Sequence, residues 1–325
     1  MNYHFVVKVF DIKINNLLSR GKKIDENARI SNGAQNYKRL FVNEAFVNAI
    51  GILEARALED CTYFYEIGEF NQLKIVFEGE YPPTIYLNYL MRKMQLFLNS
   101  LWLVKDNSVN LETGYLHLYP NKRPFQGTIH SNAIGSSPTN CFGEFNETVF
   151  TTEELELAIK YYNILLKEET DLKDTGGERL PSRNPLTKEN GRIGRAFYFM
   201  MLARYESVLP IKIMNYCSVL ECLFTSDSSE VTHKVSERFA RFMGNNFEER
   251  KIFFKLVKDL YKIRSKAVHG QPVNSTPEDM RKLLKEIDNS IREIFVGYFM
   301  KEEKYKVFDE KQEQYEKWFN ELILN

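Results

Sequence analysis

The sequence predicts an α+β protein in which a mixed α/β domain over residues 1–170 precedes an all-α bundle of about five helices over residues 191–325. Three observations predict this class. Several short segments of the first half are rich in β-branched and aromatic residues, which favour strands. From Ile193 onward, apolar residues recur at helical spacing. Between the halves, residues 171–190 are polar and contain Gly-Gly and two prolines, as is typical of a flexible connection.

In the first half, the segments HFVVKVFDIKI, CTYFYEIG, QLKIVFEG and GYLHLY are predicted strands, at residues 4–14, 61–68, 72–79 and 114–119. A helix is predicted over residues 84–104, where apolar residues follow a 3.6-residue period. Residues 121–147 are rich in Gly, Ser, Asn and Pro and are expected to be irregular. A second helix begins after a Thr151 or Thr152 cap, with acidic residues in its first turn.

The second half reads as consecutive amphipathic helices joined by short turns, which indicates a bundle. The predicted helices cover residues 192–208, 210–224, 229–243, 247–268 and 277–299, with one more near the end, at 316–325. Pro210 and Pro277 suit first helical turns, and Gly244 suits a helix end.

Composition excludes several classes of protein. The chain has 325 residues, 43% of them hydrophobic, and a formal net charge of zero, so any affinity for nucleic acid must come from a local patch. Its four cysteines show no C-x-x-C spacing, and no run approaches the ~18 apolar residues of a membrane span. We therefore expect a soluble cytoplasmic protein without membrane association. Neither metal-ligand spacing nor a phosphate-binding loop is present, and we expect no metal or cofactor.

One stretch, YKIRSKAVHG at residues 261–270, ends a predicted helix with Arg264 and His269. Residues five apart do not share a helix face. Either the helix end must deviate at Gly270 and Pro272, or a second chain must supply a complementary pair. Arginine is a planar phosphate clamp and histidine transfers protons near neutral pH. Alternatively, both side chains only bond the last carbonyls of the helix.

The charge around this stretch is locally positive. Residues 230–270 contain ten Lys/Arg and five Asp/Glu on a chain with no net charge. Phosphate contacts need such a surplus, although solvated helix faces also carry extra lysines.

Three ordered motifs carry a family resemblance: V-L-E-C-L-F over Val219–Phe224, S-E-R-F-A-R-F-M over Ser236–Met243, and the stretch just described. With them, residues 191–300, about a third of the chain, resemble the HEPN domain family, most closely its Apea-like branch. The resemblance implies a metal-independent endoribonuclease whose two copies face each other in a homodimer and cleave RNA in the shared cleft.

Carried onto this chain, the resemblance makes His269 the general acid or base and Arg264 the clamp on the scissile phosphate. Ser265 stands where the family often has Asn, Asp or His, and it can donate only a hydroxyl hydrogen bond. Lys266 could add charge to the cleft. Glu221 occupies a position that the family usually fills with Glu; it could orient an arginine of the fourth helix or form a purely structural ion pair. Arg238 and Arg241 are expected to be solvated or bonded to Glu237 and its neighbours.

In this family such an architecture commonly serves bacterial toxin or antiphage systems, in which RNA cleavage arrests the host as an abortive infection. The N-terminal domain would then sense a trigger or bind an inhibitor protein. Two other classes of function stay open. One is a non-catalytic adaptor, in which the helical domain only dimerises and the first domain binds a ligand or protein. The other is a regulator that binds a small molecule through its first domain.

Overall fold

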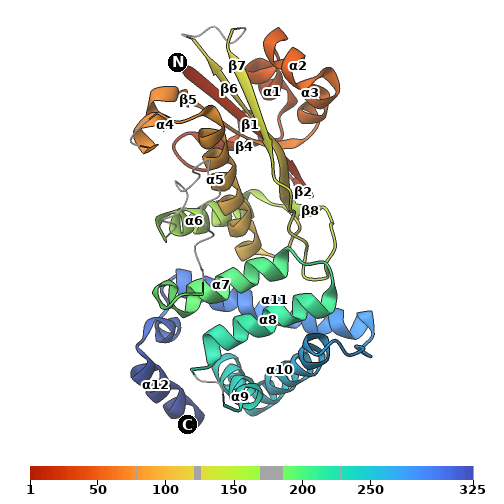
Figure 1. Cartoon of the computed structure of the whole chain (residues 1–325), viewed down its shortest axis with the longest axis vertical. Coiled ribbons are helices and arrows are strands. Elements are labelled where there is room, and N and C mark those ends of the chain that lie inside the picture. Colours follow the sequence, from red (N-terminus) through yellow and green to blue (C-terminus); the bar gives the residue numbers. More distant parts are fainter. Residues whose placement is uncertain (78–79, 121–125, 169–185, 227–228, 325) are drawn as a thin grey trace. The chain divides into compact units, whose positions relative to one another are not determined.

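The computed structural model of the chain describes residues 1–77, 80–120, 126–168, 186–226 and 229–324. The chain forms two compact units. The sheet unit consists of Met1–Ser137 and Phe145–Ser182 (Figure 1). The helical unit consists of Pro138–Glu144 and Arg183–Asn325. The segment Pro138–Glu144 therefore belongs with the helices, although the sequence analysis placed it in the first domain. Most of the predicted connection over 171–190 lies outside the described residues, and Lys188–Asn190 forms a 3₁₀ turn, η1.

The sheet unit is built on six antiparallel strands in the order β3-β4-β5-β1-β6-β7. Their bounds are β1 Asn2–Phe10, β3 Lys22–Lys23, β4 Ala28–Ser31, β5 Thr62–Glu69, β6 Asn110–Tyr119 and β7 Thr128–Ala133. Two short strands, β2 (Ile12–Ile14) and β8 (Thr148–Phe150), pair in parallel beside it. β1 is central because it pairs with both β5 and β6.

Helices pack on both faces of the large sheet, since its residues alternate between them. Val6, Tyr63, Tyr65 and Tyr115 face one side and share a core with α1, α2 and α3. On the other side Phe64 meets Phe97 of α5 with ring centroids 5.3 Å apart. The helices of this unit are α1 Ala34–Phe41, α2 Glu44–Ile50, α3 Ile52–Glu59, α4 Phe70–Phe77, α5 Pro83–Val104 and α6 Thr152–Glu168.

Several predictions for the first half are confirmed and others are wrong. The long helix is α5, Thr151 caps α6 by accepting from the Glu154 backbone N–H at 3.2 Å, and the first strand is present but breaks at Asp11, where φ is 58°. Residues 72–77 of the predicted strand belong instead to α4, which begins at Phe70 and buries Phe70 and Leu73 three residues apart. Residues 78 and 79 of that prediction lie outside the described residues. The segment predicted to be irregular contains β7, and α1, α2 and α3 were not foreseen.

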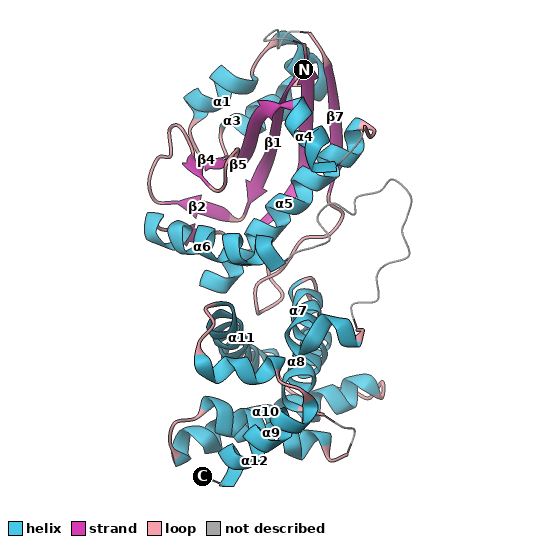
Figure 2. Ribbon diagram, turned by 90° about the vertical axis from the view of Figure 1, so that its left-hand side faces the viewer, coloured by secondary structure: helices cyan, strands magenta, loops and turns pink. Residues whose placement is uncertain are grey.

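The helical unit contains six α-helices in its described residues (Figure 2). They are α7 Gly191–Arg204, α8 Leu209–Phe224, α9 Val231–Met243, α10 Phe247–Val268, α11 Pro277–Phe299 and α12 Gln312–Leu324, with a 3₁₀ helix, η2, over Glu303–Asp309. Asn246 caps α10 and Thr276 caps α11, each accepting a backbone N–H three residues later. The coarse prediction of an N-terminal sheet followed by helices is thus confirmed. No helix within the described ranges combines the length and apolar character that crossing a bilayer requires.

Helix α12 closes the C-terminal end of α8. The Tyr315 ring lies 3.8 Å from the Arg192 guanidinium and 5.6 Å from that of Arg238. The Tyr315 hydroxyl donates to the Leu223 carbonyl at 2.6 Å, and Arg192 donates to the Thr225 carbonyl at 2.6 Å. These bonds satisfy carbonyls that a helix end leaves without intrahelical partners.

Candidate functional site

Helix α10 ends just before Gly270, as the sequence predicted. His269 is the C-cap of α10, and Gly270 adopts a left-handed φ of 64°. The Gln271 N–H donates to the Lys266 carbonyl at 2.8 Å and the Gly270 N–H to the Ala267 carbonyl at 3.2 Å. This pair of bonds is the Schellman motif, which needs a residue tolerant of positive φ at the position of Gly270.

The imidazole of His269 is exposed to solvent. Ser265 is also exposed and Lys266 is half-buried, and both lie about one turn before His269 on the same side of α10. The last carbonyls of the helix accept backbone N–H groups, including that of His269 itself at 3.2 Å from the Ser265 carbonyl. Among the described residues, neither Arg264 nor His269 bonds these carbonyls through its side chain, so the alternative of simple side-chain capping is wrong.

Arg264 is held by an ion pair with Glu221 of α8. The Arg264 Nη2 atom lies 3.2 Å from the Glu221 Oε1 atom, and the two side chains are 33% and 26% exposed. Tyr261 donates its hydroxyl to the same oxygen at 3.0 Å, and its ring lies 5.6 Å from the guanidinium. Burial, and after it the Glu221 carboxylate, raise the pKa of Tyr261, so the hydroxyl stays a donor at neutral pH. The ion pair that the sequence suggested for Glu221 is present.

Arg264 and His269 leave α10 in different directions. The helix is regular through Val268, so five residues correspond to about 140° around its axis. The deviation at Gly270 comes only after His269 and does not turn its side chain toward Arg264. The first explanation offered by the sequence, a deviating helix end that joins the two within one chain, is therefore wrong. The other explanation, a complementary pair supplied by a second chain, stays a prediction.

Two residues near this site were misjudged from sequence. Arg238, expected to be solvated, is 3% exposed; it donates to the Phe224 carbonyl and pairs with Glu316 of α12. Its spacing from the buried Val235 and Phe242 placed it on the core side of α9 and could have revealed this. Tyr261 was given no role from sequence, although it lies three residues before Arg264 and so on the same face.

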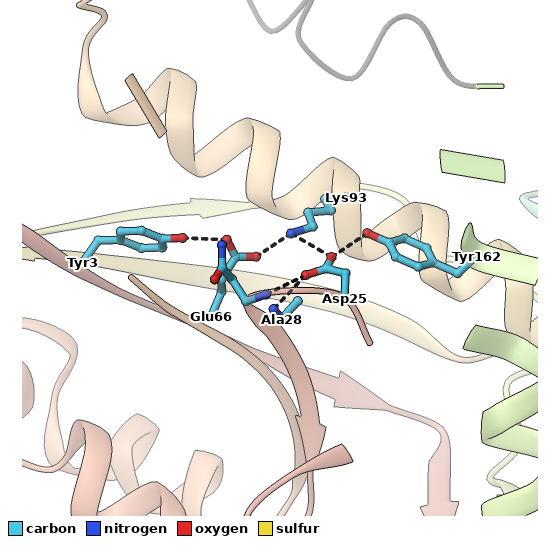
Figure 3. A network of polar contacts seen from close by, with 7 residues as sticks. Tyr3, Asp25, Ala28, Glu66, Lys93 and Tyr162 are labelled. Atoms are coloured by element: carbon cyan, nitrogen blue, oxygen red, sulfur yellow. Dashed lines mark hydrogen bonds and ion pairs between the residues drawn. The ribbon is translucent and has the colours of Figure 1, made fainter. Parts of the chain in front are cut away.

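The sheet unit contains a second cluster of ionisable groups, centred on Lys93 of α5 (Figure 3). The Lys93 ammonium lies 2.7 Å from the Glu66 carboxylate and 2.8 Å from that of Asp25. Tyr3 donates to Glu66 at 2.6 Å, and Tyr162 donates to Asp25 at 3.0 Å. Burial acts to lower the pKa of Lys93, but the two carboxylates outweigh it and raise that pKa, so the ammonium is charged. The cluster ties α5 and α6 to the sheet, a structural task.

On the other face of the sheet, His4 of β1 lies opposite His117 of β6. The His4 Nε2 atom and the Tyr119 hydroxyl share a hydrogen bond of 2.6 Å, and the His4 ring packs edge-on against Phe41. Burial, followed by repulsion from His117, lowers the pKa of His4 to about 4. His4 is therefore a neutral core residue at physiological pH.

No protein-family model, no curated protein and no solved structure matches the chain. The side chains gathered at α8 and α10 are therefore the guide to function.

Proposed function

We propose that the helical unit is a HEPN-type, metal-independent endoribonuclease that works as a homodimer. Each site would combine Arg264 of one copy with His269 of the other. The observation that carries the proposal is how exposed the Arg264 guanidinium and the His269 imidazole are and what each of them contacts. The guanidinium is partly exposed and fixed by Glu221, while the imidazole is exposed and bonds no other side chain among the described residues.

The side chains match the task of phosphodiester cleavage. The guanidinium has five N–H donors, and Glu221 is its one acidic partner within the described residues, so donors remain for a phosphate. Ser265 and Lys266 lie beside His269 and would add a hydroxyl and a positive charge. The three ordered motifs of the HEPN resemblance support the same assignment.

The proposed reaction needs no group beyond the protein and the RNA. The 2′-hydroxyl attacks the adjacent phosphorus while a His269 imidazole takes its proton. The bond from phosphorus to the 5′-oxygen breaks, and that oxygen receives a proton from the imidazolium that has formed. Arg264 stabilises the charge that develops on the phosphoryl oxygens. The products are a 2′,3′-cyclic phosphate and a 5′-hydroxyl end.

The test is cleavage of labelled RNA in EDTA by the parent, His269→Ala and Arg264→Ala. We expect loss of general acid–base catalysis to slow cleavage by about 10²–10⁴-fold. Loss of the clamp should cost about 10²–10³-fold. His233→Ala, which removes an exposed histidine of α9, is the matched control and should cleave like the parent.

A substrate with a single ribonucleotide in a DNA strand should be cut only after that nucleotide and should leave a cyclic phosphate. Equal cleavage by the parent and both variants would contradict the proposal, because the activity would then come from elsewhere.

One observation favours a second candidate, the non-catalytic adaptor. Arg264 already has an anionic partner, and about 140° of helix separates it from His269. In that case the helical unit only dimerises, and the sheet unit binds a ligand or protein. A dimeric parent protein that leaves every RNA intact would decide for the adaptor. If the nuclease proposal holds, the sheet unit is the part that would sense a trigger or bind an inhibitor in a toxin or antiphage system.

A further inference from the structure

Helix α10 carries a row of lysines on its outer side. Lys251, Lys255, Lys258, Lys262 and Lys266 follow one another at intervals of four, three, four and four residues. On a regular helix this spacing keeps all five within about 80° of the circumference and spreads them over about 22 Å. The apolar side of the same helix is occupied by the core, where Leu256, Val257 and Leu260 are buried.

The ammonium groups of this lysine row are largely uncompensated. Lys251, Lys255 and Lys262 are exposed, and Lys258 and Lys266 are half-buried. Within the described residues only Lys262 has a carboxylate partner, Asp259 at 2.7 Å. Exposed lysines are usually interspersed with acidic residues. The ion pairs that they form contribute little to stability. The four ammonium groups without a carboxylate partner in the described part of the chain repel one another, and a bound polyanion relieves this repulsion.

The surplus of positive charge is a property of α10 and not of the helical unit as a whole. Residues 250–270 contain seven Lys/Arg and one Asp/Glu. The neighbouring helix α11, Pro277–Phe299, contains four Lys/Arg and five Asp/Glu. Two acidic residues of α10, Glu248 and Glu249, are confined to its first turn, where they complement the helix dipole.

We infer that the lysine row binds the phosphodiester backbone of RNA and leads it along α10 toward His269. The imidazole lies three residues beyond Lys266, on the same side of the helix as the row. The inference rests on the proposed function for the choice of RNA among linear polyanions. A lipid surface fits less well, because a membrane-binding helix needs a free apolar face and that of α10 is packed in the bundle.

Binding is measured separately from cleavage by fluorescence anisotropy with a fully 2′-O-methylated RNA, which has no attacking hydroxyl. A single strand and a duplex of equal length are both used, because both carry the backbone. If five phosphates are neutralised, log Kd should rise with log salt with a slope of about 3.5 for the single strand.

The variant Lys251→Gln/Lys255→Gln/Lys258→Gln/Lys262→Gln should lose about 2.8 of that slope and bind at least about tenfold more weakly at low salt. Glutamine has a helix propensity close to that of lysine, so circular dichroism should be unchanged. Lys282→Gln/Lys285→Gln, on the exposed surface of α11 among acidic residues, is the matched control and should bind like the parent.

The inference is overturned if the fourfold variant binds both RNAs like the parent, or if anionic vesicles of phosphatidylserine bind more tightly than RNA in a lysine-dependent way. Cleavage by the parent together with unchanged binding by the variant would contradict the role of the lysine row but not the nuclease function. Lysine-dependent binding without any cleavage would contradict the nuclease function but not the role of the lysine row.

Discussion

Lys93 is an ammonium group enclosed between the Glu66 and Asp25 carboxylates. Replacing it with methionine leaves the buried Glu66 carboxylate and the half-buried Asp25 carboxylate near each other without a cation. We expect Lys93→Met to lower the free energy of unfolding of the sheet unit by about 3–5 kcal/mol, as when one partner of a buried ion pair is removed. Amide exchange of β1 and β5 in the full chain, followed by mass spectrometry across a urea series, measures this.

The matched control is Lys160→Met on α6, which removes an exposed ammonium. It should change stability by no more than about 0.5 kcal/mol. A Lys93→Met protein as stable as the control would mean that the ion pairs only offset the cost of burying their charges.

His4 predicts how the sheet unit responds to acid. Its pKa is about 4 in the folded chain, compared with about 6.5 for an unperturbed histidine. Between these values the unfolded chain binds a proton that the folded chain does not. Stability is therefore complete above pH ~6.5 and falls as the pH drops toward 4, by on the order of 3 kcal/mol.

His4→Gln keeps a polar group for Tyr119 and cannot take up a proton. Compared with the parent, it should show a flatter fall in the exchange protection of β1 and β6 between pH 6.5 and 5, after correction for intrinsic rates. The lowered pKa values of His117 and His130 act in the same direction, so both proteins keep some slope. Parallel curves would show that His4 is not the responsible group.

At the scale of the element, the end of α10 depends on one glycine. Gly270 has a φ of 64°, and a Cβ there meets no neighbour, so backbone strain alone opposes a side chain. Gly270→Ala should lower the stability of the helical unit by about 1 kcal/mol and increase amide exchange at residues 269–271.

Gly194 provides the opposite case. It is exposed, lies in the first turns of α7 and has no positive φ. Gly194→Ala should therefore stabilise the same unit by about 0.5–1 kcal/mol in urea unfolding. The same sign for both substitutions would contradict a role for φ at Gly270.

Elements with strong local signals were predicted well. The bounds of α10 and α11 agree with the sequence prediction to the residue, because Asn246 and Thr276 cap them and apolar residues keep the helical period. Short elements were predicted less well. The apolar run of α4 is compatible with either a strand or a helix, and β7 is a polar strand at the sheet edge with no buried face to impose alternation.

The candidate site could be predicted only in part from the sequence. Spacing alone showed that Arg264 and His269 cannot share a face, and the structure agrees. It did not reveal the Tyr261 hydroxyl on Glu221 or the burial of Arg238 against α12, because both depend on contacts between residues far apart in the chain. Tertiary partners of this kind leave no periodic signal in a single sequence.

At the scale of the whole molecule, the proposed sites need two copies of the chain. A mixture of Arg264→Ala and His269→Ala proteins tests this directly. In a twofold dimer of one copy of each, one composite site has both groups and the other has neither. After exchange of subunits, about half of the dimers are mixed, and the mixture should recover about a quarter of the parental cleavage.

Each variant incubated alone serves as the control and should stay inactive at every concentration. Recovery without exchange, or no recovery after exchange confirmed by native mass spectrometry, would mean that the two residues do not complement each other across copies.

The junction between Tyr315 and Leu223 also sets the timing of folding during synthesis. These residues are 92 positions apart, so the ribosome makes α8 long before the helix that caps its end. Until α12 has left the exit tunnel, the Leu223 carbonyl lacks the Tyr315 hydroxyl and the Arg238 guanidinium lacks the Glu316 carboxylate. The helical unit therefore completes its core only after α12 has emerged. A nascent chain that has not yet presented α12 holds Arg264 and Glu221 on an unfinished scaffold.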